Sequence, residues 1–120
     1  MKTMKLTIAI LIFSTASAFA QKYEYTQLTT IESVIPGGLG RSRMITTKPN
    51  GDLDELKMEN FFSLVGINFG NVRGNDKMIA DKITKLSDEN WELVSVTPGV
   101  YATESNGIFI TRYLLKRLKK

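Results

Sequence analysis

The sequence predicts an α+β domain: an antiparallel sheet of about four strands with one main helix packed on one face. Three observations indicate this class. A stretch rich in aromatic and β-branched residues begins at residue 22, and two further stretches of this kind lie near the carboxyl end. Between them, residues 75–88 carry hydrophobic side chains at helical spacing. Strands that precede and follow a single helix along the chain are typical of an antiparallel sheet with the helix covering one face.

Residues 1–20 have the pattern of a secretory signal peptide. Lys2 and Lys5 precede an apolar run, and small residues follow, ending in Ala18-Phe19-Ala20. The apolar part is too short as a helix to cross the roughly 30 Å hydrocarbon core of a bilayer. We therefore expect cleavage near Ala20, or after Ala18 at an alternative site. The mature protein is then expected to be periplasmic or secreted, with no transmembrane segment.

The remaining residues, 21–120, have the length of one domain. The chain contains no cysteine, so no disulfide holds it together, although exported proteins usually meet an oxidising compartment. Of its 16 basic residues, two lie in the expected leader and five lie in the last nine positions. Because residues 21–111 hold more acidic than basic side chains, we expect no nucleic-acid partner.

The first two strands are expected to form a hairpin. Residues 22–34 are rich in tyrosine, threonine and isoleucine, and an extended pattern resumes over 41–47. The loop from Pro36 to Gly40 separates them, which predicts the hairpin. Lys48-Pro49-Asn50-Gly51 is then a predicted turn, with Asn-Gly supplying positive φ.

Residues 52–65 allow two interpretations. Three leucines share a helical face, namely Leu53, Leu56 and Leu64, and Asp52 with Glu55 resembles a capping box. The same segment also alternates between apolar and polar residues, as a strand does. We prefer an extended or mixed segment, because Phe61-Phe62 and Leu64-Val65 favour strands. The connection that follows is expected to be irregular, because it contains Gly66, Gly70 and Gly74.

The clearest predicted helix spans residues 75–88, with Asn75 as its N-cap. Its hydrophobic stripe consists of Met78, Ile79, Ile83 and Leu86. Asp81 lies four residues before Lys85, which predicts an ion pair on the exposed face. Asn90 is expected to end the helix in the left-handed conformation.

A strand over 91–96 is expected after this helix, followed by a break at Pro98-Gly99. Ser105-Asn106-Gly107 predicts a turn, and residues 108–117 predict the last strand. Trp91, the only tryptophan, opens the first of these two strands. We expect its ring to be a structural anchor packed against the helix.

The chain resembles a family of small bacterial domains of unknown function. The resemblance rests on Asn90-Trp91-Glu92-Leu93-Val94, on Tyr113-Leu114-Leu115-Lys116-Arg117, and on the opening Tyr23-Glu24-Tyr25. The family pattern has glycine where this chain has Asn90. The match covers about half of the expected mature chain and leaves residues 35–74 as an insertion. It implies the fold but no activity, since the family has none established.

The absence of histidine and cysteine excludes several kinds of chemistry. It removes Ser-His-Asp and Cys-His catalysis, as well as zinc sites built from nitrogen or sulfur ligands. The acidic residues from Asp52 to Glu59 lack the glycine and the final glutamate of a calcium-binding loop. We therefore expect no catalytic residues, no metal site and no cofactor. The alternative is a small envelope enzyme that uses carboxylate or Ser-Lys chemistry.

The expected function is that of a non-catalytic binding or interaction module for an unknown macromolecule. Its contact surface is expected in the insertion, which includes the segment from Phe61 to Phe69. The glycine loop offers backbone amides and nearby charges for an anion or a partner: Gly37, Gly38, Gly40, Arg41 and Arg43. The oligomeric state is left open, including association through an open sheet edge.

Overall fold

The structure is a computed structural model that describes residues 20–35, 41–104 and 106–120. The main body of the expected leader and the glycines Gly37, Gly38 and Gly40 lie outside these residues. The described chain forms a five-stranded antiparallel sheet in the order β3-β2-β1-β7-β6. Its strands are β1 (Tyr23–Ser33), β2 (Arg43–Thr47), β3 (Leu53–Lys57), β6 (Glu92–Ala102) and β7 (Gly107–Leu118).

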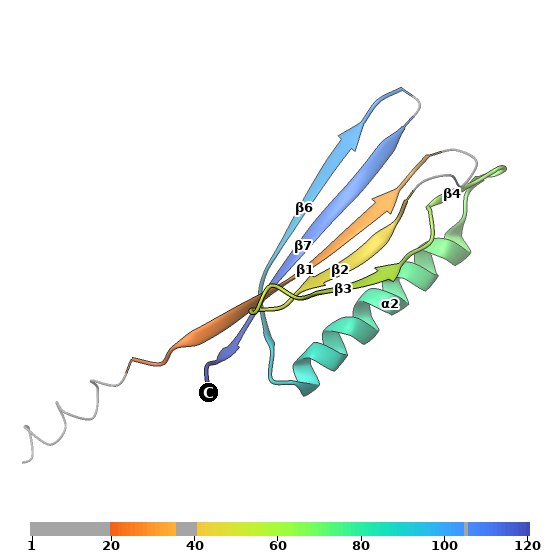
Figure 1. Cartoon of the computed structure of the whole chain (residues 1–120). Coiled ribbons are helices and arrows are strands. Elements are labelled where there is room, and N and C mark those ends of the chain that lie inside the picture. The colour runs from red at the N-terminus through yellow and green to blue at the C-terminus, as the bar shows by residue number, and fades with distance from the viewer. Residues whose placement is uncertain (1–19, 36–40, 105) are drawn as a thin grey trace, which may run out of the picture.

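The α+β class predicted from the sequence is confirmed. One helix, α2 (Phe69–Asp88), runs along one face of the sheet, beneath β1, β2 and β3, while the far ends of β6 and β7 extend away from it (Figure 1). A second sheet consists of two very short strands, β4 (Phe62–Ser63) and β5 (Gly66–Ile67). The main sheet has one strand more than the expected four, because the ambiguous segment contributes β3.

The central strand β1 sets which side chains face the helix. It pairs with β2 on one side and with β7 on the other, so Leu28 lies between Thr46 and Tyr113. Even-numbered residues of β1 from Thr26 to Glu32 are buried on the helix side. The hairpin predicted for residues 22–47 is therefore present, and Gly51 has the positive φ (89°) expected of the next turn.

The helix begins six residues before the predicted start. Asn68 is its N-cap, and the Asn68 side chain accepts a hydrogen bond from Asn71 N at 3.1 Å. Asn75, the predicted N-cap, instead lies inside the helix and is fully buried. Gly70 and Gly74 suggested an irregular connection, but a glycine in a helix costs only about 1 kcal/mol. The hydrogen bonds of Asn75 to neighbouring segments offset part of that cost.

The end of the helix follows the prediction more closely. Asn90 has a φ of 68°, and Trp91 N donates to Leu86 O at 3.0 Å. The predicted stripe packs in or against the core. However, Asp81 pairs with Lys77 at 2.6 Å and not with Lys85, because Lys77 reaches it from the preceding turn.

Strand β6 corrects another prediction. It continues from Glu92 through Pro98 and Gly99 to Ala102, although a break was expected there. The strand lies at the edge of the sheet, where a residue without an N–H group is tolerated. A bulge lies between Leu93 and Ser95. Of the predicted 105–107 turn, Ser105 lies outside the described residues.

The core lies between the helix and the sheet. Its buried hydrophobic members are Leu28, Met44, Met58, Leu86, Trp91 and Leu115. Within the part of the chain that the structure describes, no helix is both long and apolar enough to cross a membrane.

Candidate binding sites

Trp91 joins the core to a charged surface. The residue is 6% exposed and belongs to the same buried cluster as Leu86. The Arg117 guanidinium lies 4.3 Å from the centre of the ring, so the indole contacts both the core and a cation. Arg117 Nε also donates to Glu24 Oε1 at 2.5 Å, and a terminal nitrogen donates to Glu89 O at 3.3 Å. Arg117 therefore links β7, β1 and the end of α2.

A cavity of about 450 Å³ lies beside this arrangement. Its walls come from the carboxyl-terminal half of α2, the helix-facing side of the sheet and the turn between β2 and β3. Leu86, Trp91 and Pro49 give it an apolar part. Cavities of this size are typical of small-molecule sites, in which a few polar groups fix the ligand within apolar walls.

The charged groups that line this cavity are four cations and three carboxylates, namely Lys48, Lys82, Lys85 and Arg117 with Glu24, Asp54 and Glu89. Lys82 Nζ donates to Asp54 Oδ2 at 2.6 Å, and this hydrogen bond and the Lys82 charge lower the pKa of the Asp54 carboxyl. Lys48 and Lys85 lower the same pKa further, so three lysine charges act on one carboxylate. Neither Lys48 nor Lys85 is in an ion pair with another described residue.

Two threonines of neighbouring strands complete the sheet wall. Thr26 Oγ1 donates to Thr47 O at 2.6 Å. Thr46 is 3% exposed, and its hydroxyl has no hydrogen-bond partner among the described residues. Buried polar groups in proteins are nearly always paired, so a hydroxyl in this state marks a place where a ligand or water can bind.

A buried carboxylate lies elsewhere between the helix and the sheet. Glu32 is 8% exposed and accepts from Asn75 Nδ2 at 3.1 Å. Burial raises the pKa of the Glu32 carboxyl, the Asn75 hydrogen bond lowers it, and Asp76 raises it. Burial also raises the pKa of Tyr113, as do the charges of Glu32 and Asp76. Glu32 does not line the cavity beside Trp91, so its unusual pKa is not coupled to that space.

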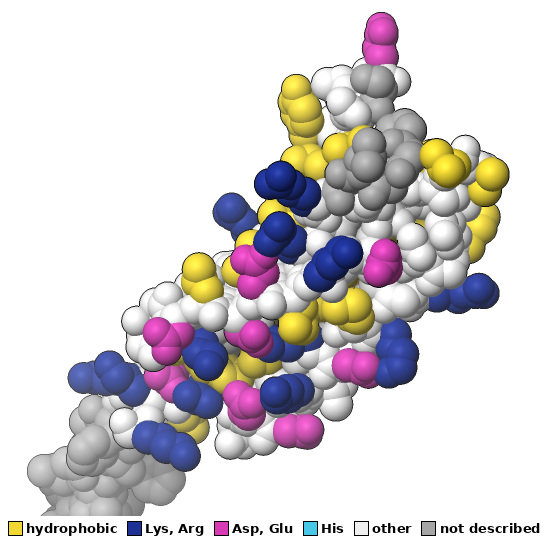
Figure 2. Space-filling view, turned by 45° about the vertical axis from the view of Figure 1, so that its right-hand side comes forward, with side chains coloured by type: hydrophobic (Ala, Val, Ile, Leu, Met, Phe, Trp, Pro, Cys, Tyr) yellow, Lys and Arg dark blue, Asp and Glu magenta, His cyan; other side chains and the backbone are white. Residues whose placement is uncertain are grey.

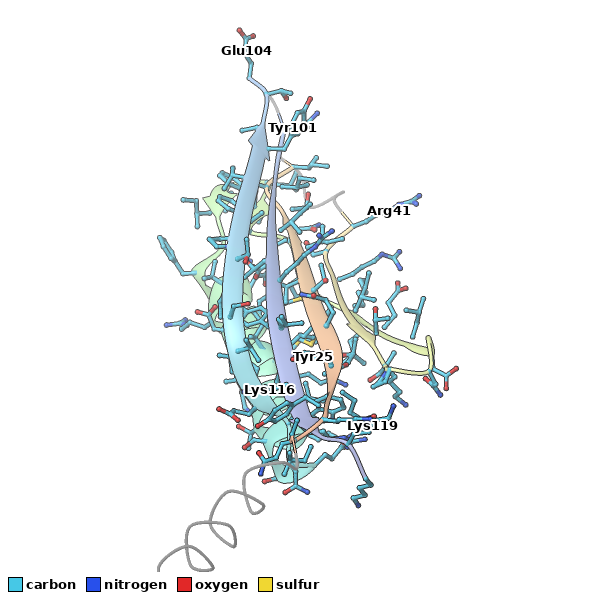
Figure 3. All side chains as sticks on the ribbon, turned by 90° about the vertical axis from the view of Figure 1, so that its left-hand side faces the viewer. Tyr25, Arg41, Tyr101, Glu104, Lys116 and Lys119 are labelled. Carbon is cyan, nitrogen blue, oxygen red and sulfur yellow. The ribbon has the colours of Figure 1, made fainter. Side chains whose placement is uncertain are left out.

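The arginines singled out in the sequence lie together at the start of β2. Arg41 points away from the sheet (Figure 3), and Arg43 forms an ion pair with Glu55 of β3. Ser42 between them is buried, and its hydroxyl donates to Asn60 Oδ1 at 2.8 Å. The acidic Glu55 beside Arg43 weakens this place as an anion site. No group of three Asp or Glu residues that could hold a metal occurs among the described residues.

The β4–β5 hairpin is the most exposed apolar feature of the described chain. Leu64 and Val65 at its turn are 90% and 96% exposed, and Ile67 and Phe69 follow at 53% and 69%. Figure 2 shows hydrophobic side chains gathered at this upper right corner of the molecule. These four residues, Leu64, Val65, Ile67 and Phe69, are called the hairpin patch below.

The hairpin patch stands on a well-anchored base. Asn68 N donates to Phe61 O at 2.7 Å, and Asn71 Nδ2 donates to Asn60 O at 2.9 Å. The Phe61 ring packs on Phe109 of β7, with ring centres 5.7 Å apart. The hydrophobic side chains are therefore held in solvent by a base that is tied both to the helix and to the main sheet.

Comparison of the chain with protein-family models, with curated proteins and with solved structures found no match. The sequence alone placed the hairpin patch within the expected contact segment and predicted Trp91 as a structural anchor. It did not find the cavity, since Lys48, Lys85 and Arg117 come from three distant segments. Only the strand register shows that Arg117 lies opposite Glu24.

Proposed function

We propose that this protein is an exported, non-catalytic interaction module that docks on a protein partner through the hairpin patch. The observation that carries the proposal is the near-complete exposure of Leu64 and Val65 on a short, anchored hairpin. Burying a leucine or a valine contributes about 1.5–3 kcal/mol, so leaving two of them in water forgoes a large gain. A contact with a partner recovers that gain, and exposed apolar patches commonly mark such contacts.

Two further features support this proposal. The pattern over residues 1–20 supports export, and the resemblance to small bacterial domains supports a family in which no catalytic activity is established. The chain has neither histidine nor cysteine for proton transfer or nucleophilic attack near neutral pH. The buried Glu32 is tied to Asn75, which is consistent with a structural role.

Photo-crosslinking in intact cells tests the proposal. A photoreactive amino acid is placed at position 64, and at position 87 as a control on the exposed end of α2. We expect position 64 to capture one defined protein that position 87 does not capture. Val65→Asp should abolish this product, whereas Ser87→Asp should leave it unchanged.

The same experiment has outcomes that refute the proposal. Equal capture from both positions would show that the hairpin patch is not a specific contact. Capture of lipid alone would assign the patch to a membrane surface instead of a protein. A product that survives Val65→Asp in a variant that melts like the wild type would also refute it.

A further inference from the structure

We infer that the cavity beside Trp91 is a binding site for a small organic anion, with a carboxylate or phosphate group held among Lys48, Lys82 and Lys85. This site is separate from the hairpin patch. The cavity is formed by the opposite half of α2, and none of the four hairpin patch residues lines it.

The charges of the cavity carry the first step. Three carboxylates line the cavity: Glu24 binds Arg117 and Asp54 binds Lys82, while Glu89 forms no ion pair with a described residue. Lys48 and Lys85 remain beside Asp54 without an ion pair to a described residue. The lining therefore holds four cationic groups against three carboxylates, and this excess of positive charge favours an additional negative group.

The unpaired Thr46 hydroxyl is the second, independent observation. It belongs to a residue that is 3% exposed, in the sheet wall of the same cavity. Leaving a buried hydroxyl unpaired costs about 1–3 kcal/mol, and an oxygen of a bound ligand removes that penalty. An ordinary cluster of solvated surface lysines would not be accompanied by a buried, unpaired hydroxyl, so Thr46 is evidence for a ligand beyond the lysine charges.

The apolar part of the cavity indicates an organic ligand rather than a bare ion. Leu86 and Pro49 line the same space as the lysines, and so does Trp91 under its Arg117 cation. An inorganic ion would use the ammonium groups only. A molecule with a short apolar body would also cover the hydrophobic wall, and the volume of about 450 Å³ is large enough for both parts.

The single tryptophan provides a direct test. Its indole N–H gives one resonance in a ¹H–¹⁵N spectrum of the purified protein, and the ring lines the cavity. The probes are phenyl phosphate, benzoate, inorganic phosphate and the neutral benzyl alcohol. We expect saturable shifts of the indole resonance with at least one aromatic anion, at a Kd of about 1 mM or tighter. Benzyl alcohol and inorganic phosphate should each bind about tenfold more weakly.

Matched variants locate the anion. Lys48→Gln with Lys85→Gln should weaken binding of the aromatic anion about tenfold. The control pair, Lys57→Gln with Lys77→Gln, removes the same charge outside the cavity and should leave the Kd unchanged. Tighter binding of phenyl phosphate than of benzoate assigns a phosphate ligand, and the reverse order assigns a carboxylate.

Three results would overturn the inference. One is the absence of saturable binding by either aromatic anion. The second is equal affinity for benzyl alcohol, which would make the cavity merely apolar. The third is an equal loss of affinity in the two double-lysine variants, which would show that binding depends only on the overall charge of the protein. All three are independent of the hairpin crosslink, so failure of one proposal leaves the other intact.

Discussion

Asn75 provides the sharpest test of how the helix is attached to the rest of the domain. It is fully buried, and its side-chain amide makes three hydrogen bonds that leave the helix. Asn75 Nδ2 donates to Glu32 Oε1 at 3.1 Å and to Glu59 O at 2.7 Å, and Asn75 Oδ1 accepts from Glu59 N at 2.9 Å. One side chain therefore joins α2 to β1 and to the segment after β3.

Replacing Asn75 with alanine removes all three hydrogen bonds. Each contributes about 1 kcal/mol net, while alanine improves helix propensity by about 0.7 kcal/mol. The groups left behind without partners add to the loss. We therefore expect Asn75→Ala to lower the free energy of unfolding by about 3 kcal/mol, which is a fall in Tm of about 15 °C for a domain of this size.

Urea unfolding followed by circular dichroism measures this loss. Thr84→Ala is the matched control, because Thr84 is exposed on the same helix and its hydroxyl bonds only to Ala80 O at 2.9 Å. It should change stability by no more than about 0.5 kcal/mol. A loss below about 1 kcal/mol in Asn75→Ala would refute the assigned role.

The remaining predictions concern three other buried groups. Glu32 has a raised pKa when folded, so it binds protons more tightly in the folded state and its contribution to stability falls as pH rises above 4.5. Glu32→Gln should therefore melt above the wild type at pH 7, with the gap narrowing on acidification; a pH-independent gap contradicts this. Thr46→Val should raise the free energy of unfolding by about 1 kcal/mol in calorimetry, because the hydroxyl has no partner among the described residues. The same variant should weaken binding of the aromatic anion. Trp91→Ala should lower the free energy of unfolding in urea by about 3–5 kcal/mol. A variant as stable as the wild type would show that the Trp91 ring does not contribute to the core.

Much of the fold could be predicted because its signals are local. The alternation in β1 and the stripe Met78, Ile79, Ile83 and Leu86 each depend on neighbouring residues alone. Asn90 could be placed in the left-handed region for the same reason. The extended interpretation preferred for residues 52–65 was also correct, since β3 and β4 both lie within it.

The errors have a common physical cause. Intrinsic propensity predicts boundaries at Gly70, Gly74 and Pro98, but tertiary contacts override propensities of a few kcal/mol or less. The local sequence predicts Asn75 as a helix cap, because its hydrogen-bond partners lie on segments far away in sequence and leave no local signal.

The candidate sites show the same division. The apolar residues of the hairpin patch are consecutive or nearly so, and the sequence alone therefore placed them in the expected contact segment. The cavity requires the strand register, because Thr46, Lys85 and Arg117 meet only when β2, α2 and β7 are assembled. From the sequence alone, Arg117 is indistinguishable from the other basic residues of the carboxyl terminus.

The affinity of the captured partner for a doubly substituted hairpin tests the central claim most directly. Leu64→Asp with Val65→Asp adds two charges where two exposed hydrophobic side chains now lie. We predict that binding weakens by about a hundredfold or more while Tm stays unchanged. Thr84→Asp with Ser87→Asp adds the same charge on exposed helix positions and should bind normally. Wild-type affinity in the hairpin variant would contradict the account.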